Sequence, residues 1–246
     1  MIVGRGLLAS AFAPLYESND DVVVFASGVS NSLETEASNF QREEAMLTEL
    51  LLGHGAARLV YFGSCGVTDA DADLTPYMRH KRSMEALVLS EPRNLVLRLP
   101  QVVSRTRNPN TLTNFLRDRI ISGEQFTVWS NAERNLIDID DIVTLGSELI
   151  SHSTMQSVAI CIAALRSTPM PGIVKIFEDV LGKAANCTYV QKGAPMRIDT
   201  RAVDDLSSSL GLDLGEGYAE RIIRKYYAEY RAHDARSDHS IAKNTA

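Results

Sequence analysis

Hydrophobic residues in the first 100 positions form two kinds of pattern that alternate along the chain. Short unbroken runs (VVVF, LVYF and LVL) are typical of strands that are buried on both faces of a parallel sheet. Between these runs, apolar residues recur at helical spacing over residues 7–15, 38–52 and 76–90. Strands that alternate with helices predict an α/β fold whose parallel strands are joined by right-handed crossovers. Within 38–52 the expected core positions are Phe40, Met46, Leu47, Leu50 and Leu51.

The pattern changes after Pro100, which ends the fourth of these strands. The later elements are shorter and less regular. Apolar spacing and turn residues predict short strands in QFTVW, QSVAICIA and ANCTYVQ. They predict helices over 109–122, in the second half of NLIDIDDIVTLGSELI, over 171–182 and over 216–232.

The composition is that of a globular domain: of 246 residues 45% are hydrophobic and 23% are charged, with a formal net charge of −6. No block of Lys or Arg suggests a nucleic-acid partner, and no apolar run approaches the length that crosses a membrane. A folded-domain pattern that begins at Met1 gives no sign of a signal peptide. The cysteines have no metal-binding spacing and leave an odd thiol, so we expect a reducing, cytoplasmic setting and no metal site. They are Cys65, Cys161 and Cys187.

Gly4, Gly6 and Ala9 form the pattern G-x-G-x-x-A directly after the first strand and at the start of the first helix. Glycines in such a turn let the backbone approach a pyrophosphate, and the helix N-terminus offers N–H groups and the positive end of its dipole. The same residues would also suit a tight turn without a ligand. The strand–turn–helix context favours a dinucleotide.

No acidic residue ends the second strand, where a carboxylate would bind the adenine ribose of NAD(H). Arg5 lies inside the glycine turn instead, and a guanidinium at this place could bind the 2′-phosphate of NADP(H). The sequence therefore leans slightly towards NADP(H) over NAD(H). An Arg5 side chain that merely points into solvent would leave the same pattern.

Tyr77 and Lys81 lie four residues apart on one face of a predicted helix, and Ser64 ends the preceding strand. Because the carboxyl ends of parallel strands face the ligand crevice, the three side chains could converge there. An ammonium about 4 Å from the phenol would favour phenolate by roughly 4 kcal/mol, or about three pKa units, which would suit acid–base catalysis. Each residue alone is more often structural, and only their order after the glycine turn favours catalysis. Three histidines have no evident partners in the sequence: His54, His80 and His152.

Taken in order, these segments resemble the extended short-chain dehydrogenase/reductase family, in particular its nucleotide-sugar epimerases, dehydratases and ketoreductases. GRGLLA is similar to the cofactor turn of the family, VYFGSCGVTD to the strand that carries its catalytic serine, and YMRHK to its Tyr-x-x-x-Lys element. LVLRLPQVV resembles the following strand, and ERNLIDIDDIV the segment whose arginine contacts the diphosphate of the substrate. IDTRAVDDLSSSLGL resembles the segment that ends the substrate lobe.

The resemblance implies a shortened Rossmann-like core over 1–103, a smaller substrate-binding lobe over 104–233 that is interleaved with the end of the core, and a flexible tail over 234–246. Arg134 would bind the substrate diphosphate, although a surface salt bridge with Asp138 or Asp140 is an alternative. The site residues implied are Ser64, Tyr77 and Lys81 for catalysis; Gly4, Arg5, Gly6, Leu7, Leu8, Ala26, Ser27, Gly28, Tyr77, Lys81 and Pro100 for the cofactor; and Gln101 and Arg134 for the substrate.

The chain departs from the family in its length. The distance from the first strand to FASGVSNS suggests that a strand–helix–strand piece is missing. FASGVSNS then resembles the later strand that runs beneath the cofactor, and the usual groups that bind the adenine ribose would be lost.

The reaction is expected to be simple carbonyl chemistry. Cys65 and Gly66 stand where family 4,6-dehydratases have an Asp-Glu pair, and NPNTLTNFL lacks the histidine of enzymes that epimerise C3 and C5. The expected function is an NAD(P)H-dependent reductase of a nucleotide-linked 4-keto sugar, in the biosynthesis of cell-surface polysaccharide. Two alternatives are a C4 epimerase with tightly bound NAD and a non-catalytic dinucleotide-binding regulatory protein. The resemblance also implies a homodimer through helices 38–52 and 76–90.

Overall fold

The computed structural model describes residues 1–53, 55, 57–68, 74–151 and 157–231. The chain divides into two compact units. Of the described residues, unit 1 contains those of Met1–Pro100, Ile139–Ala163 and Arg197–Leu212, and unit 2 contains Gln101–Asp138, Ala164–Met196 and residues 213–231. Each unit is therefore built from three separate segments of the sequence.

Unit 1 is centred on a five-stranded parallel sheet with the strand order β1-β2-β3-β4-β9. The strands come from the unbroken apolar runs of the sequence, and their central residues are almost completely buried. The predicted parallel α/β sheet is thereby confirmed. The strands are β1 (Ile2–Val3), β2 (Val22–Phe25), β3 (Arg58–Ser64), β4 (Leu95–Leu99) and β9 (Val158–Cys161).

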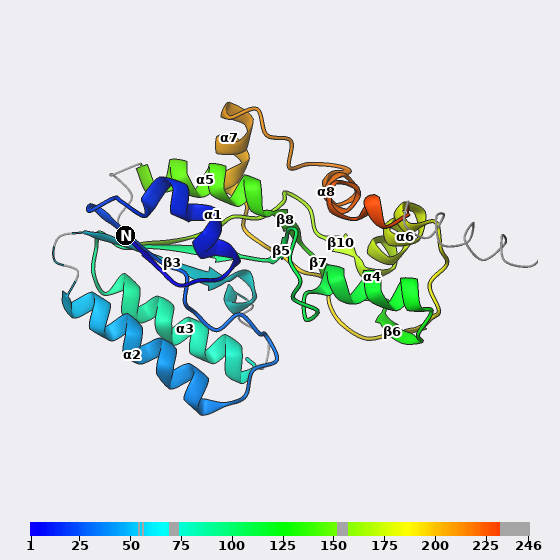
Figure 1. The fold of residues 1–246 in the computed structure, drawn as a ribbon, viewed down its shortest axis with the longest axis horizontal. Helices are drawn as coiled ribbons and strands as arrows, with labels where there is room; N and C mark the ends of the chain where they lie inside the picture. Colours follow the sequence, from blue (N-terminus) through cyan, green and yellow to red (C-terminus); the bar gives the residue numbers. More distant parts are fainter. Residues whose placement is uncertain (54, 56, 69–73, 152–156, 232–246) are drawn as a thin grey trace, which may run out of the picture. The chain divides into compact units, whose positions relative to one another are not determined.

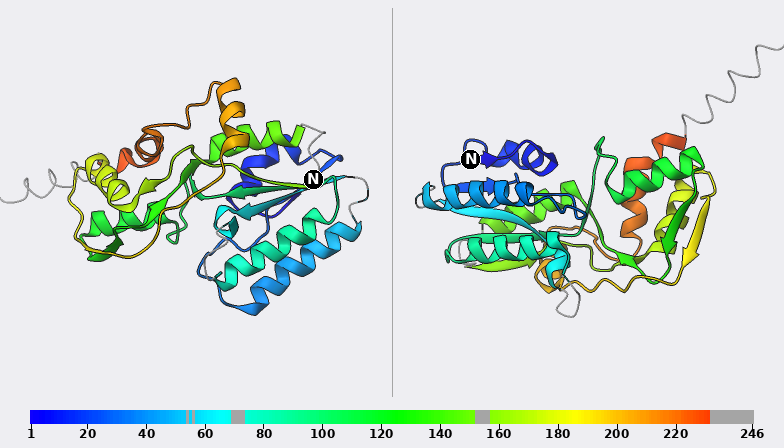
Figure 2. Two further views of the ribbon diagram at one scale, coloured as in Figure 1. Left: turned by 180° about the vertical axis from the view of Figure 1, so that it is seen from behind. Right: turned by 90° about the horizontal axis from the view of Figure 1, so that it is seen from below.

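Helices cover both faces of this sheet (Figure 1). On one face α2 (Ala37–Gly53) packs against α3 (Pro76–Leu89), and on the other α1 (Leu7–Tyr16) packs against α5 (Ile139–Ser151). The same two layers of helices are visible from behind (Figure 2). A short 3₁₀ turn, η1 (Cys65–Thr68), leads out of β3.

The sheet ends at β1, whose partner is β2. In a complete dinucleotide-binding sheet further strands lie on the far side of the first strand. The strand order therefore agrees with the strand–helix–strand piece inferred to be missing from the sequence. As a result, unit 1 keeps the half of the sheet that carries Ser64, together with the helix α3 that carries Tyr77.

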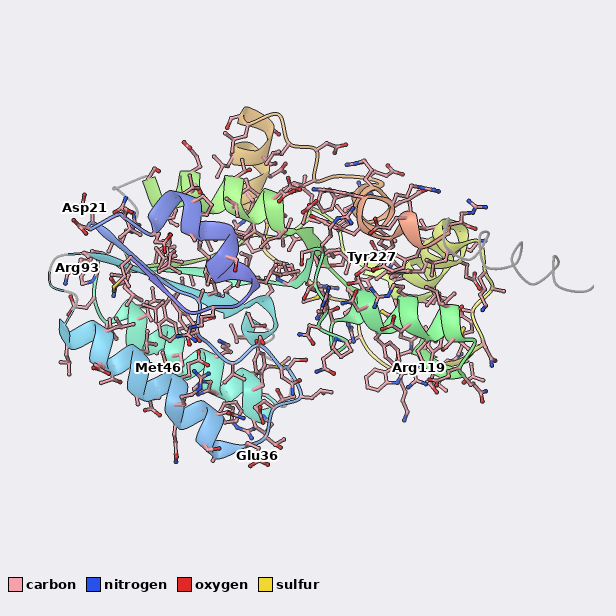
Figure 3. All side chains as sticks on the ribbon, viewed as in Figure 1. Asp21, Glu36, Met46, Arg93, Arg119 and Tyr227 are labelled. Carbon is pink, nitrogen blue, oxygen red and sulfur yellow. The ribbon has the colours of Figure 1, made fainter. Side chains whose placement is uncertain are left out.

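The side chains that α2 buries against the core are apolar, except for the carboxylate of Glu43. Leu47 is completely buried, and Met46 (labelled in Figure 3), Leu50 and Leu51 are partly buried against the same cluster. The only other buried residue of α2 is Glu43, which has no exposed surface. A carboxylate in this position needs compensating partners.

Over its described residues, unit 2 contains three two-stranded sheets and three helices. Tyr227 of α8 (labelled in Figure 3) packs against Phe177 of α6, with ring centroids 5.1 Å apart. Asp138 accepts hydrogen bonds from Lys225 and Tyr226, both at 2.6 Å, and so anchors α8. The pairs are β5 (Gln101–Val103) with β8 (Leu136–Asp138), β7 (Glu133–Arg134) with β10 (Thr168–Pro169), and β6 (Phe126–Trp129) with β11 (Cys187–Val190); the helices are α4 (Leu112–Ser122), α6 (Met170–Leu181) and α8 (Tyr218–Tyr227).

One expectation about the later chain is wrong. The segment IDTRAVDDLSSSLGL was expected at the end of the substrate lobe, but residues 197–212 belong to unit 1. There α7 (Arg201–Ser209) contacts α5 and β9 because its buried residues, Val203 and Ser207, lie on one face. The tail expected over 234–246 lies outside the described residues.

Two further features bear on the class of protein. Within the described part of the chain, no helix is both long and apolar enough to cross a membrane. Over the same residues, no three His, Cys, Asp or Glu side chains gather as metal ligands would.

Candidate active site

The glycine turn after β1 has the backbone geometry that a phosphate site requires. Gly4 has a φ of +132°, and a Cβ at this position would lie 2.5 Å from the carbonyl oxygen of Ala26. Gly6 has open space on its Cα and precedes α1 without a side-chain cap. The N–H groups in the first turn of α1 are therefore available to an anion. Around them Arg5 and Leu7 are exposed, and Leu8 is half-buried.

The segment after β2 lies beside this turn, because Gly4 approaches Ala26 and Ser27 closely. Arg42 of α2 donates to the Ser27 carbonyl oxygen at 3.1 Å and to its hydroxyl at 3.3 Å. Sequence reasoning did not single out Arg42. Its exposed guanidinium adds a second cation, after Arg5, to the residues near the glycine turn.

Ser64 and Tyr77 meet at the carboxyl end of β3. Ser64 lies close enough to the phenol to lower the pKa of Tyr77, and its hydroxyl accepts a bond from the N–H of Gly66 at 3.2 Å. Tyr77 lies in the first turn of α3, which Thr75 caps by accepting from the N–H of Met78. The phenol is 8% exposed. The structure thus brings together two of the three residues proposed for catalysis.

Lys81 follows one turn later on α3, but its ammonium is already engaged. Nζ donates to the hydroxyl of Tyr61 at 2.9 Å and to Oε1 of Glu43 at 3.0 Å. It lies 6.0 Å from the centre of the Tyr77 ring. The side chain of Lys81 is 4% exposed and that of Glu43 is fully buried. The ammonium is therefore half of a buried ion pair.

This pairing changes the expected acidity of Tyr77. Burial, followed by the negative charge of Glu43, raises the pKa of Tyr77 to about 12, and the nearby Ser64 offsets only part of this rise. The direction is opposite to the one expected from the spacing of Tyr77 and Lys81. The reason is that the sequence argument placed an unpaired ammonium near the phenol, whereas Glu43 compensates it.

Glu43 is the main site residue that sequence reasoning missed. Its carboxylate also accepts from the N–H of Val29 at 2.6 Å and pairs with Nε2 of His80 at 3.0 Å. No partner of His80 was evident from the sequence, and Glu43 is that partner; His54 and His152 lie outside the described residues. The signal in the sequence was an acid one helical turn before Leu47, on the apolar face of the predicted helix.

A second buried ion pair lies one turn further along α3. Arg98 of β4 donates to Oε2 of Glu85 through Nε at 2.9 Å and through a terminal nitrogen at 2.6 Å. Cys65 contacts the carbonyl oxygen of Arg98 at 3.4 Å, and its hydrogen bond with Cys161, together with burial, raises the pKa of its thiol. These surroundings therefore favour the neutral thiol of Cys65.

The remaining candidates are Pro100 in unit 1 and two residues of unit 2. Pro100 is the last residue of the first segment of unit 1 and is half-buried. In unit 2, Gln101 begins β5, where its N–H donates to the Asn135 carbonyl oxygen at 3.0 Å. Arg134 is half-buried and donates to the Glu133 carbonyl oxygen at 2.7 Å. Among the described residues no carboxylate pairs with Arg134, so neither expected salt bridge forms; burial lowers the pKa of its guanidinium.

Comparisons with known proteins add an independent observation. The sequence matches the NAD dependent epimerase/dehydratase family over residues 11–161, which is more than half of the chain. No curated protein matches the sequence.

Solved structures share the fold at low sequence identity. MoeE5 in complex with UDP-glucuronic acid and NAD has a TM-score of 0.71 at 18% identity, covering 94% of this chain and 85% of MoeE5. UDP-glucuronic acid 4-epimerase from Bacillus cereus has a TM-score of 0.69 at 15% identity, covering 93% of this chain and 79% of the epimerase. RMD from Pseudomonas aeruginosa, complexed with NADPH, has a TM-score of 0.67 at 15% identity, covering 93% of this chain and 88% of RMD. These likenesses confirm the Rossmann-like fold.

The family match and the sheet topology agree with the resemblance found in the sequence, although the sheet is shortened beyond β1. The chain belongs to the NAD dependent epimerase/dehydratase family of enzymes.

Proposed function

We propose that the chain is an NAD(P)H-dependent reductase of a keto sugar carried on a nucleotide, with the carbonyl at C4. Such a product would feed the synthesis of cell-surface polysaccharide. The proposal names one reaction within a family that contains both epimerases and dehydratases.

The observation that carries the proposal is the state of Tyr77. A buried phenol whose pKa is raised to about 12 keeps its proton at neutral pH. Reduction of a carbonyl needs a proton donor for the oxygen, whereas oxidation of an alcohol needs a base. The protonated Tyr77 therefore supports reduction as the reaction that starts from the resting protein.

The proposed substrate class rests on unit 2 and on the comparisons. MoeE5 and the Bacillus cereus epimerase are known in complex with UDP-glucuronic acid. In this chain, Arg134 offers a half-buried guanidinium that no described carboxylate neutralises, which supports binding of a diphosphate. Gln101 is the second residue proposed to contact the substrate.

The glycine turn fits the cofactor, because Gly4 permits close approach to Ala26 and Gly6 leaves open space before α1. The pyrophosphate would be held by the turn and the N-terminus of α1, and the nicotinamide side by Ser27, Gly28 and Pro100. Arg5 and Arg42 support a preference for NADP(H), since both are exposed cations near the turn. A bound NAD(P)H would supply the hydride.

The residues of the chain would manage the proton and the orientation of the substrate. The hydroxyl of Ser64 would bind the carbonyl oxygen and hold it against the phenol of Tyr77. Tyr77 would then donate its proton to that oxygen as the alcohol forms. Lys81, fixed by Glu43 and Tyr61, would pack against Gly28 and so support the backbone that is proposed to contact the cofactor.

The test is turnover with a panel of 4-keto nucleotide sugars, in which oxidation of NADPH or NADH is followed by absorbance. Wild type is compared with Tyr77→Phe and with Tyr189→Phe, whose ring is 54% exposed on β11. We expect a loss of at least a hundredfold for Tyr77→Phe, with binding of the cofactor retained, and no change for Tyr189→Phe.

Other results would replace the proposal. Stoichiometric NAD in the purified protein, with interconversion of C4 epimers and no net oxidation of NADPH, would make the chain a C4 epimerase. Binding of dinucleotide without turnover of any substrate in the panel would instead support the non-catalytic regulatory protein.

Dimer formation through α2 and α3 stays a prediction. Leu52 on α2 is 85% exposed, which is consistent with an unpaired apolar contact on this pair of helices. Sedimentation of wild type and Leu52→Glu tests it, since the variant should shift a dimer towards monomer.

A further inference from the structure

The carboxylate of Glu43 is saturated with donors. Oε1 accepts from the Tyr61 hydroxyl at 2.6 Å and from the Lys81 ammonium at 3.0 Å. Oε2 accepts from the N–H of Val29 at 2.6 Å and pairs with His80 at 3.0 Å. An ionised carboxylate offers about four lone-pair sites, and all of them are used. Because the carboxylate is only an acceptor, Nε2 of His80 carries the hydrogen of this bond.

The four donors come from three different parts of unit 1. Val29 follows β2, Tyr61 belongs to β3, and His80 and Lys81 are neighbours on α3. One side chain of α2 thus ties the catalytic helix to the middle of β3 and to the segment that follows β2. His80 is further fixed by stacking on Phe40, with ring centroids 4.6 Å apart.

The charged side chains around Tyr77 form two ion pairs, in each of which an acid and a base compensate one another. On α3, Lys81 is compensated by Glu43 of α2, and Glu85 is compensated by Arg98 of β4. Ser64 and Tyr61 of β3 add neutral hydroxyls. No uncompensated cation therefore remains among these groups to attract a phenolate.

The geometry points to Glu43 as a positioning residue of the catalytic site, which fixes the Lys81 ammonium against Gly28 and cancels its charge, so that Tyr77 remains a neutral proton donor. The reaction named here rests on the proposed function. The arrangement itself concerns only residues of unit 1, and it can be tested without substrate or cofactor.

Two observations support this role. A Cβ at Gly28 would lie 2.6 Å from Nζ of Lys81 and 2.8 Å from Oε1 of Glu43, so the pair is packed against the backbone and cannot shift towards it. The negative charge of Glu43 is also the second cause, after burial, of the raised pKa of Tyr77. Removal of this charge should let the phenol ionise at lower pH.

The experiment is an alkaline titration of the unliganded protein by the absorbance change of tyrosine ionisation. The difference between wild type and Tyr77→Phe isolates Tyr77, and the difference between Glu43→Gln and Glu43→Gln/Tyr77→Phe isolates it in the variant. We expect the Tyr77 midpoint to lie above that of free tyrosine, which is about 10, in wild type and to fall by about one pH unit or more in Glu43→Gln.

Glu44→Gln is the matched control, because Glu44 is exposed on the same helix and should leave the midpoint unchanged. A wild-type midpoint below 10, or a midpoint that does not move in Glu43→Gln, would overturn the proposal. If Glu43→Gln does not fold, Glu43→Gln/Lys81→Met removes both charges of the pair. In this double variant the Tyr77 midpoint should also fall, because the negative charge of Glu43 is gone, and an unmoved midpoint would overturn the proposal.

The outcome is separable from that of the proposed function. Absence of turnover with every keto sugar would end the reductase proposal and leave the titration unaffected. If turnover is found, the alkaline limb of kcat should move to lower pH in Glu43→Gln, which a purely structural role of Glu43 would not produce.

Discussion

Gly28 lies directly against the ammonium of Lys81: a Cβ at residue 28 would stand 2.6 Å from Nζ. The glycine is needed here for space, since the next nearest atom is Oε1 of Glu43 at 2.8 Å. Both atoms belong to a buried ion pair that has little freedom to move. The backbone after β2 and the Lys81–Glu43 pair therefore form one packed unit.

Gly28→Ala should accordingly damage this packing. We expect a loss of about 1–3 kcal/mol in the free energy of unfolding, because an extra methyl displaces the ends of both buried side chains. Denaturant unfolding measures it. Gly53→Ala is the control, because no atom lies within 4 Å of a Cβ at this position on α2, so it should leave stability unchanged or raise it. Equal stability of Gly28→Ala and wild type would contradict the close contact.

The two glycines of the first turn should respond differently to alanine. Gly4→Ala places a Cβ 2.5 Å from a backbone oxygen at a φ of +132°, so we expect a fall of more than about 2 kcal/mol in the free energy of unfolding. Gly6→Ala meets open space and should retain stability. If the turn binds a pyrophosphate, Gly6→Ala should still weaken binding of NADPH, measured by fluorescence titration, whereas unchanged binding would argue against a phosphate at Gly6.

Much of unit 1 could be predicted from the sequence because its signals are local. The apolar runs at Val22–Phe25, Arg58–Ser64 and Leu95–Leu99 become neighbouring parallel strands, and helical spacing places α2 and α3 within one residue at each end. Tyr77 and Ser64 were singled out because their order along the chain carries information. The short strands of unit 2, such as β7 and β10, carry too few residues to form a recognisable pattern.

The electrostatics of the site could not be predicted because they depend on distant residues. Lys81 and Glu43 are 38 positions apart, and nothing in the spacing of Tyr77 and Lys81 indicates that the ammonium is compensated. An acid on the apolar face of a helix is a warning that a buried partner exists, but it does not identify that partner. The acidity of Tyr77 was therefore predicted in the wrong direction, although its place in the first turn of α3 agrees with the predicted helix.

Arg134 should matter for ligand binding more than for folding. No described carboxylate pairs with its guanidinium, so Arg134→Ala leaves no buried acid unpaired and should change the free energy of unfolding by less than about 1 kcal/mol. Loss of charged hydrogen bonds to a diphosphate should weaken binding of a nucleotide sugar by about 10- to 100-fold in calorimetry. Arg119→Ala is the control, since Arg119 (labelled in Figure 3) forms an exposed pair with Glu124. A large fall in stability without a change in affinity would make Arg134 structural.

Glu43 should also give the protein a distinct dependence of stability on pH. Burial opposes ionisation of this carboxyl, but Lys81, Tyr61 and the Val29 N–H outweigh burial and lower its pKa. Because the folded-state pKa lies below that of an unfolded glutamate, the stability contributed by ionised Glu43 is complete above the unfolded pKa and is lost as the pH falls through the folded pKa.

Glu43→Gln leaves Lys81 buried without a counter-charge, so it should lower the free energy of unfolding by about 3 kcal/mol or more at neutral pH. Below the ordinary glutamate pKa of about 4.3, the difference between wild type and Glu43→Gln in the free energy of unfolding, measured with denaturant, should become smaller. The reason is that wild type loses the stability contributed by ionised Glu43, which the variant lacks at every pH. A gap of constant size from neutral to acidic pH would mean that the charge of Glu43 contributes nothing, and that its hydrogen bonds alone hold α2 to α3.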